Sequence, residues 1–162
     1  MQTTTYRCHN SIETAVLLHH GSPRRERCDM SLTVLVIYGD YIVQKTQILI
    51  VEDDTNIFEA FQDILLLAFG DNVEITWVQR AEAALALDLS GHRIIITDFN
   101  LGSGMKGNEL VSALRAKYAD SIYIVGASND DTAPKLFAEA GVNAYHDKLS
   151  SVLISERIAH LF

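Results

Sequence analysis

The sequence contains only two cysteines, no long apolar run and no excess of basic residues. Both cysteines, Cys8 and Cys28, fall within the first thirty residues, and no C-x-x-C pair is present to suggest a structural zinc site. The longest apolar stretches, residues 32–38 and 64–69, are far shorter than the roughly 20 residues that a membrane-spanning helix needs. No continuous apolar segment typical of a secretory signal follows the start. These absences argue against a secreted or membrane-spanning protein and predict a cytoplasmic location.

The shortage of basic residues is concentrated in one part of the chain. Residues 47–162 hold eight Lys/Arg and seventeen Asp/Glu, a net charge of −9, whereas residues 1–46 hold five and four, a net charge of +1. An acidic surface repels phosphate backbones, which argues against nucleic acid as a partner of residues 47–162. A basic partner or a bound cation is the more natural expectation.

The 162 residues suffice for one domain with a sizeable core and a short extension. Residues 1–46 are interpreted as a leader. Its first 30 residues are rich in Thr, Ser, His and Arg without clear periodicity, which predicts disorder. Residues 32–43 form two β-prone runs around Gly39 and Asp40, which predicts a short hairpin. Residues 47–162 are predicted to be the folded domain.

From residue 47 onward, short apolar runs alternate with segments of helical period. The predicted strands are residues 48–51, 73–78, 93–97, 122–127 and 144–146. The predicted helices are residues 56–69, 81–89, 108–118, 133–140 and 151–161. Five such alternations predict an α/β domain whose parallel sheet is covered by helices on both faces.

Charged side chains follow three of the predicted strands. Glu52, Asp53 and Asp54 follow the first strand, Asp98 ends the third, and Lys148 follows the fifth. If the strand order is 2-1-3-4-5, the first and third strands are neighbours and their carboxylates share one pocket at the carboxyl edge. Clustered carboxylates need a counter-charge, and Mg²⁺ suits them because it takes oxygen ligands. The alternative is that these acidic groups only cap the following helix, a role we assign to Asp54.

Four segments carry a family resemblance: ILIVEDD at the first strand, IIITDFNL at the third, IVGAS at the fourth and AYHDK at the fifth. Together they resemble the receiver domains of response regulators in two-component signalling, over residues 47–162. The resemblance implies a flavodoxin-like, doubly wound, five-stranded parallel sheet of order 2-1-3-4-5. It also implies a Mg²⁺ site made by Glu52, Asp53, Asp98 and the backbone carbonyl of Asn100. Asp98 would then accept a phosphoryl group from a histidine kinase or a histidine phosphotransfer protein.

The resemblance implies further roles around that site. Lys148 would pair with the phosphoryl group, and Tyr145 matches the aromatic switch position. Ala127 is small enough to leave room for a donor imidazole. A carboxylate is a recognised phosphoryl acceptor, and a metal and a lysine neutralise charge on the transferring group. The glycines of the loop after Asp98 allow it to turn tightly. These glycines are Gly102, Gly104 and Gly107.

Three positions depart from the family pattern. Gly126 stands where the family usually has Ser or Thr, whose hydroxyl couples phosphorylation to a conformational change. Ser128, two positions on, is the alternative hydroxyl. Leu149 replaces the usual proline after the lysine, and because a non-proline cis bond costs about 3–4 kcal/mol, we expect a trans bond or a rearranged loop. The loop GSGMKG is one residue longer than the common form and lacks its proline.

Alternative functions stay open at this point. Gly126 and Leu149 favour a degenerate receiver that binds proteins without phosphorylation. An aspartate-nucleophile phosphatase is a third hypothesis, although such sites have a D-x-D pattern and position 100 is Asn. A nucleotide-binding module is disfavoured because its phosphate would face acidic groups. The chain stops after its closing helix, so we expect the signal to reach a downstream protein target by direct contact, without turnover of a separate substrate.

Overall fold

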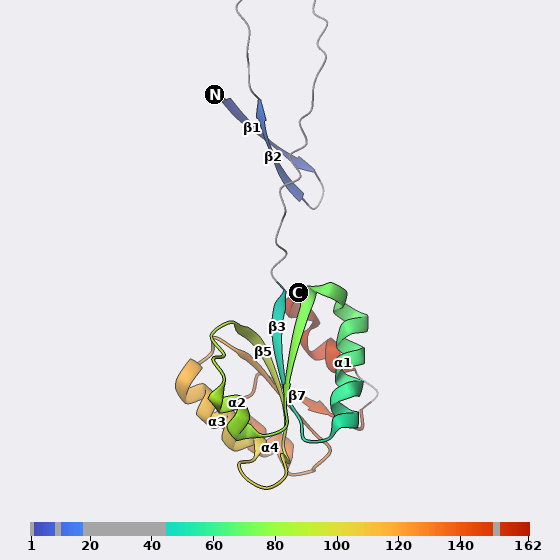
Figure 1. Ribbon diagram of the computed structural model, residues 1–162, viewed down its shortest axis with the longest axis vertical. Helices are drawn as coiled ribbons and strands as arrows, with labels where there is room; N and C mark the ends of the chain where they lie inside the picture. The colour runs from blue at the N-terminus through green and yellow to red at the C-terminus, as the bar shows by residue number, and fades with distance from the viewer. Residues whose placement is uncertain (1, 9–10, 18–44, 151–152) are drawn as a thin grey trace, which may run out of the picture. The chain divides into compact units, whose positions relative to one another are not determined.

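The computed structural model describes residues 2–8, 11–17, 45–150 and 153–162. The chain divides into two compact units, Met1–Asp40 and Tyr41–Phe162 (Figure 1). Among the described residues, no helix combines the length and the apolar character that crossing a bilayer requires.

The first unit contains a two-stranded antiparallel hairpin. Strand β1 (Gln2–Cys8) pairs with β2 (Ser11–Leu17) in a register that runs from Gln2 opposite Leu17 to Cys8 opposite Ser11. The disordered leader that the sequence predicted over residues 1–46 stays a prediction. The sequences QTTTYRC and SIETAVL are rich in β-branched residues, which favour extended backbone even where alternation is weak. The hairpin predicted at residues 32–43 lies outside the described residues.

The second unit is built on a five-stranded parallel sheet. Its strands are β3 (Thr46–Val51), β4 (Val73–Val78), β5 (His92–Asp98), β6 (Tyr123–Ser128) and β7 (Ala144–Asp147). They lie in the order β4-β3-β5-β6-β7, which is the predicted 2-1-3-4-5 order for this sheet. The flavodoxin-like fold expected from the sequence is therefore confirmed.

Helices cover both faces of the sheet (Figure 1). On one face lie α1 (Thr55–Phe69) and α5 (Ile154–Ile158), whose buried side chains pack with Ile48, Ile50 and Ile96. On the other lie α2 (Ala81–Ala86), α3 (Gly107–Tyr118) and α4 (Ala133–Ala140), which pack on Leu49, Val51 and Ile95. Alternate residues of each strand thus point into the two cores, because side chains along a strand alternate between its faces. Two short 3₁₀ segments, Gly70–Asn72 and Ala159–Leu161, follow α1 and α5.

Two helices are shorter than predicted. The helix expected over residues 81–89 ends at Ala86, because the Asp88 carboxylate accepts a hydrogen bond from Ser90 N at 3.0 Å and forms a local turn instead. The helix expected over residues 151–161 starts at Ile154 and continues as the 3₁₀ turn Ala159–Leu161. Residues 151–152 lie outside the described residues. The helix over Ala133–Ala140 has the predicted bounds.

Candidate functional site

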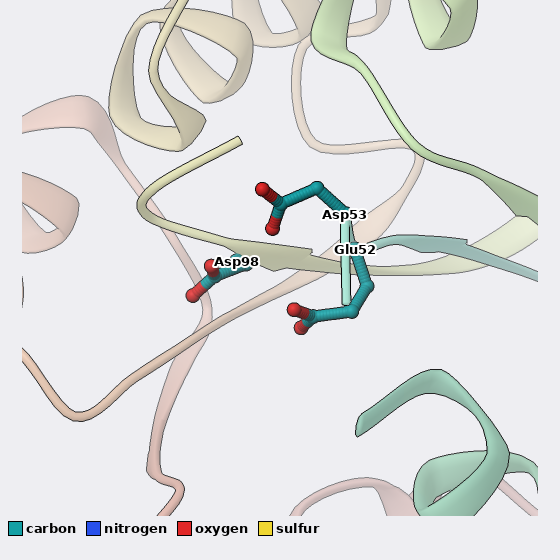
Figure 2. Close-up of side chains that lie close together, drawn as sticks. All are labelled: Glu52, Asp53 and Asp98. Carbon is teal, nitrogen blue, oxygen red and sulfur yellow. The ribbon is translucent and has the colours of Figure 1, made fainter. Parts of the chain in front are cut away.

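Three carboxylates converge at the carboxyl edge of the sheet. Glu52 and Asp53 follow β3, and Asp98 ends β5, the neighbouring strand that pairs Thr97 with Val51. One carboxylate oxygen from each lies within 4.8 Å of the others, and Figure 2 shows the three groups around a common space. Glu52 and Asp98 are buried, whereas Asp53 is exposed. The expectation that carboxylates from the first and third strands share one pocket is met.

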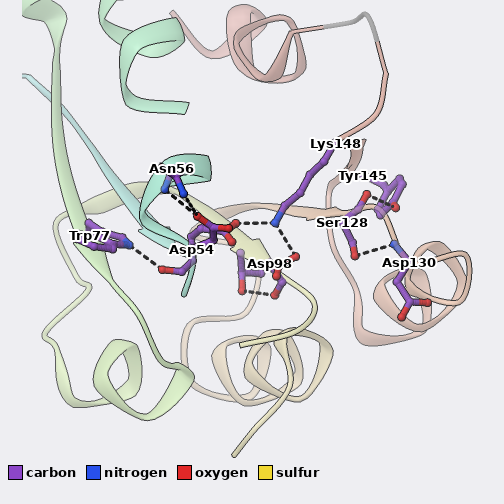
Figure 3. A network of polar contacts seen from close by, with 10 residues as sticks. Asp54, Asn56, Trp77, Asp98, Ser128, Asp130, Tyr145 and Lys148 are labelled. Carbon is purple, nitrogen blue, oxygen red and sulfur yellow. Dashed lines mark hydrogen bonds and ion pairs between the residues drawn. The ribbon is translucent and has the colours of Figure 1, made fainter. Parts of the chain in front are cut away.

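The ammonium group of Lys148 contacts two of these three carboxylates. Lys148 follows β7, and its Nζ lies 2.7 Å from Glu52 Oε2 and 3.0 Å from Asp98 Oδ1. The lysine side chain is only 12% exposed, so these ion pairs are largely withdrawn from solvent screening (Figure 3). The ion pair between Lys148 and Glu52 joins residues that are 96 positions apart in the sequence.

The charge balance of the cluster is incomplete without a further cation. Burial raises the pKa of Glu52 from 4.5 to about 7, and the ammonium of Lys148 only partly opposes this effect. The negative charge of Asp98 adds to the rise in the Glu52 pKa. Three oxygen-donor side chains, one of them open to solvent, suit a divalent cation that keeps several water ligands. The residues present therefore fit Mg²⁺.

Asp54 lies outside the acidic cluster. Its carboxylate accepts a hydrogen bond from Asn56 N at 2.8 Å and caps the start of α1, as the sequence predicted. This hydrogen bond is the main cause that lowers the pKa of Asp54. The capping alternative thus describes Asp54, but it does not describe Glu52, which faces Lys148.

The loop after Asp98 is held by contacts at both of its ends. Gly107 N donates to Phe99 O at 2.9 Å, and a Cβ at position 107 would stand 1.9 Å from the carbonyl oxygen of Asp98. Only glycine permits that approach. In the middle of the loop, the Glu82 carboxylate of α2 accepts a hydrogen bond from Met105 N at 3.0 Å. Sequence reasoning missed Glu82, because nothing in a helical pattern indicates which loop the helix will touch.

Asn100 lies at the mouth of the site, two residues after Asp98. It is exposed, and the nearby Asp130 has a pKa lowered chiefly by the hydrogen bonds that its carboxylate accepts from Thr132. The use of the Asn100 backbone carbonyl as a metal ligand stays a prediction.

The position where the family has a hydroxyl is filled by an aromatic ring. A Cβ at Gly126 would stand 2.5, 2.6 and 2.8 Å from Cδ2, Cγ and Cε2 of Phe137, a fully buried residue of α4. The ring therefore occupies the space that a Ser or Thr side chain needs. Ala127, predicted to leave room for a donor, is fully buried in the core on the α1 and α5 face. Its predicted role stays a prediction.

Tyr145, the predicted aromatic switch residue, is hydrogen-bonded to Ser128 at the end of β6. The Tyr145 hydroxyl donates to Ser128 O at 2.9 Å, and its ring lies 6.2 Å from that of Phe137 (Figure 3). Ser128 Oγ, the alternative hydroxyl, is buried and accepts a hydrogen bond from Asp130 N at 3.1 Å. Ser128 thus points the same way as Gly126 along the strand, but its oxygen is used in a local turn.

Trp77 and His146, two ring side chains near the site, pack against phenylalanines of α1. Trp77 at the end of β4 stacks on Phe58 with ring centroids 4.3 Å apart, and its Nε1 donates to Glu52 O at 2.8 Å. His146 is buried and packs edge-on against Phe61, and burial lowers its pKa. The peptide bond between Lys148 and Leu149 is trans, as expected for a non-proline residue.

Known proteins resemble this chain in sequence and in structure. No protein-family model matches it. The two-component response regulator ORR42 of Oryza sativa subsp. japonica is 39% identical over 79 residues, which are 48% of this chain. The chain covers 59% of that curated relative, somewhat less than two thirds of its length.

Solved structures share the fold. The response regulator TrrA of Thermotoga maritima, solved in complex with Mg²⁺-BeF, is 25% identical with a TM-score of 0.62, covering 72% of this chain and 99% of its own. A CheY-like response regulator receiver domain protein of Methanospirillum hungatei is 21% identical with a TM-score of 0.60, covering 73% and 91%. With the strand order and the acidic cluster already described, these similarities lead to one identification. The chain carries a receiver domain of the response-regulator type.

Proposed function

We propose that this receiver domain accepts a phosphoryl group on Asp98 in a Mg²⁺-dependent transfer from a phosphohistidine donor. The observation that carries the proposal is the position of Asp98. Its carboxylate ends β5, lies 3.0 Å from the ammonium of Lys148, and has an oxygen within 4.8 Å of carboxylate oxygens of Glu52 and Asp53. A carboxylate in such surroundings has both a nucleophilic oxygen and positive charge where the transferring group must lie.

In the proposed reaction, a carboxylate oxygen of Asp98 attacks phosphorus while the phosphorus–nitrogen bond of the donor breaks. The electron pair of that bond stays on the histidine nitrogen, and the product is an aspartyl phosphate. Lys148 would hold an equatorial oxygen of the phosphoryl group as it arrives. Glu52, Asp53 and Asp98, with the carbonyl of Asn100, would hold Mg²⁺, which supplies further positive charge to the phosphoryl oxygens when bound.

The donor in this proposal is a histidine kinase or a histidine phosphotransfer protein in the cytoplasm. The domain is an acceptor that modifies itself, rather than an enzyme that turns over a separate substrate. The acidic balance of residues 47–162, with a net charge of −9, supports protein partners with basic docking surfaces. The modified domain would then act on a downstream protein target.

The test is incubation of the full chain with acetyl phosphate and Mg²⁺, followed by intact mass measurement. We expect the parent to gain one phosphoryl group and Asp98→Asn to gain none. Asp130→Asn is the matched control, because Asp130 is a half-buried carboxylate that follows β6 at the same edge and accepts from Thr132 rather than from Lys148. Gain by Asp98→Asn, or loss of gain in Asp130→Asn, would contradict the assignment of Asp98.

The second candidate is a receiver that binds its partner without phosphorylation. The ring of Phe137 against Gly126 favours this candidate. In the family, a Ser or Thr hydroxyl at this position links phosphorylation to a conformational change, but Gly126 carries no hydroxyl and the ring fills the space that one would need. Measurement of partner binding by the parent and by Asp98→Asn separates the two. Equal binding by both proteins, with no phosphoryl gain from acetyl phosphate or from a cognate kinase, would support the second candidate.

A further inference from the structure

The backbone that carries Lys148 is held in a tight turn by Asp147. Ser150 N donates to Asp147 O at 2.9 Å, which closes a four-residue turn with Lys148 and Leu149 at its centre. Asp147 Oδ1 also accepts a hydrogen bond from Leu149 N at 2.9 Å. On the other side, Lys148 N donates to Ser128 O at 3.1 Å, so the lysine backbone is tied to β6 as well.

Packing of the Leu149 side chain does not hold the turn in place of the hydrogen bond that Asp147 Oδ1 accepts. Leu149 is 79% exposed, so its own side chain does not fix the turn against the core. A proline at position 149 would have no backbone N–H to donate, so the hydrogen bond to Asp147 depends on position 149 being a residue other than proline. Aspartate at the first position of a turn commonly accepts from the backbone two residues on. In this chain that local bond spans Lys148 itself.

The direction of the lysine backbone matters because its ammonium must meet two carboxylates at once. The Nζ lies 2.7 Å from Glu52 and 3.0 Å from Asp98, on two different strands, and it sits at the end of a flexible four-carbon stem. A small rotation of the turn moves the start of that stem and with it the ammonium. A misplacement of about 1 Å in a positioned group costs on the order of a hundredfold in rate.

We propose that Asp147 is a positioning residue for Lys148, through the hydrogen bond that its carboxylate accepts from Leu149 N. It replaces with a side-chain contact the rigidity that proline supplies after the lysine in related domains. This inference rests on the proposed role of Lys148 in phosphoryl transfer. Asp147 itself makes no contact with the acidic cluster among the contacts described; it acts on the reaction only through the lysine.

The test compares Asp147→Ala, which removes the acceptor, with Asp147→Asn, which keeps an acceptor oxygen and removes the charge. Asp88→Ala is the matched control, because Asp88 is also exposed and also accepts from the backbone two residues on, at Ser90, in the loop before the start of β5, the strand whose other end carries Asp98. Two quantities are measured on the full chain. The first is the rate of phosphoryl gain from acetyl phosphate, and the second is the dissociation constant for Mg²⁺ alone.

The fluorescence of Trp77 reports Mg²⁺ binding, since it is the one tryptophan of the sequence and donates to the Glu52 carbonyl. We expect Asp147→Ala to slow phosphoryl gain by at least about tenfold, as loss of an orienting partner does at comparable sites. We also expect it to bind Mg²⁺ about two- to fivefold more tightly than Asp147→Asn, because a displaced ammonium no longer competes for the carboxylates. Asp147→Asn and Asp88→Ala should react within about twofold of the parent, since both keep the turn at Lys148.

Three results would overturn the inference. The first is phosphoryl gain by Asp147→Ala within twofold of the parent. The second is an equal slowing in Asp147→Asn, which would assign the effect to charge. The third is weaker Mg²⁺ binding in Asp147→Ala, which would indicate general damage to the site. If the parent gains no phosphoryl group, the proposed function fails by itself, and the Mg²⁺ comparison of the two Asp147 variants still decides the positioning role.

Discussion

The contact between Phe137 and Gly126 predicts that restoring the family hydroxyl will destabilise this protein. The perturbation is Gly126→Ser, alone and combined with Phe137→Ala. A Cβ at position 126 would lie 2.5–2.8 Å from three ring carbons of Phe137, closer than side-chain atoms tolerate. Both residues are buried in the core between β6 and α4, so neither moves aside without disturbing other packing.

The expected magnitudes follow from overpacking. Gly126→Ser alone should lower the free energy of unfolding by about 1–3 kcal/mol, the usual cost of inserting atoms into a filled core. Phe137→Ala alone should cost about 3–5 kcal/mol through the lost ring and the cavity left behind. In the double variant the serine enters the space that the ring has vacated. Its stability should match that of Phe137→Ala within about 0.5 kcal/mol, which gives a coupling energy of about 1–3 kcal/mol.

The assay is urea unfolding of all variants, followed by Trp77 fluorescence and far-ultraviolet circular dichroism. Gly91→Ser is the matched control, because a Cβ at Gly91 meets no atom within 4 Å. The reasoning is refuted if Gly126→Ser is as stable as Gly91→Ser. It is also refuted if the costs of Gly126→Ser and Phe137→Ala simply add, since additive costs mean that the two side chains do not compete for space.

Three further outcomes can be measured in the same way. Folding raises the pKa of Glu52 from 4.5 to about 7, so the folded state binds the Glu52 proton more tightly than the unfolded state. The protonated carboxyl group therefore stabilises the folded state fully below pH 4.5, and this stabilisation is lost as the pH rises towards 7. Without Mg²⁺, the free energy of unfolding of the parent should therefore fall between pH 4.5 and 7 by up to about 1.4 kcal/mol per pH unit, and Glu52→Gln should show a flatter pH dependence. The same slope in Glu52→Gln as in the parent would contradict this prediction. Gly107→Ala should cost at least about 1–3 kcal/mol, because its methyl group would meet the Asp98 carbonyl at 1.9 Å, and parental stability would exclude that contact. Arg115 donates to the carbonyls of Ala119, Ile122 and Gly141, so Arg115→Lys should cost about 1–3 kcal/mol in thermal or urea unfolding, whereas a loss below about 0.5 kcal/mol would show that these bonds are dispensable.

The architecture of the domain was readable in the sequence because it depends on local periodicity. The run Ile94 to Ile96 is buried throughout, and the alternation of apolar runs with amphipathic segments predicted each strand and helix of the sheet. The meeting of Asp98 with Glu52 was expected on the condition that the strand order is 2-1-3-4-5, the order that the family resemblance implied, because residues that end neighbouring parallel strands share an edge. Errors fell at helix ends, such as Ala86, where a side-chain turn competes with the helix.

Other features were decided only by tertiary packing. The sequence showed that Gly126 lacks a hydroxyl, but only the fold reveals that Phe137, eleven positions on, fills the space. The contact of Glu82 with the loop at Met105 and the bond from Leu149 to Asp147 were likewise absent from any pattern. Periodicity records which face of an element is buried, and it therefore determined the strands and helices, whereas the strand order that joins the acidic groups was implied by the family resemblance. Periodicity carries no information on which side chains of two separate elements compete for one volume, and that choice belonged to the folded structure alone.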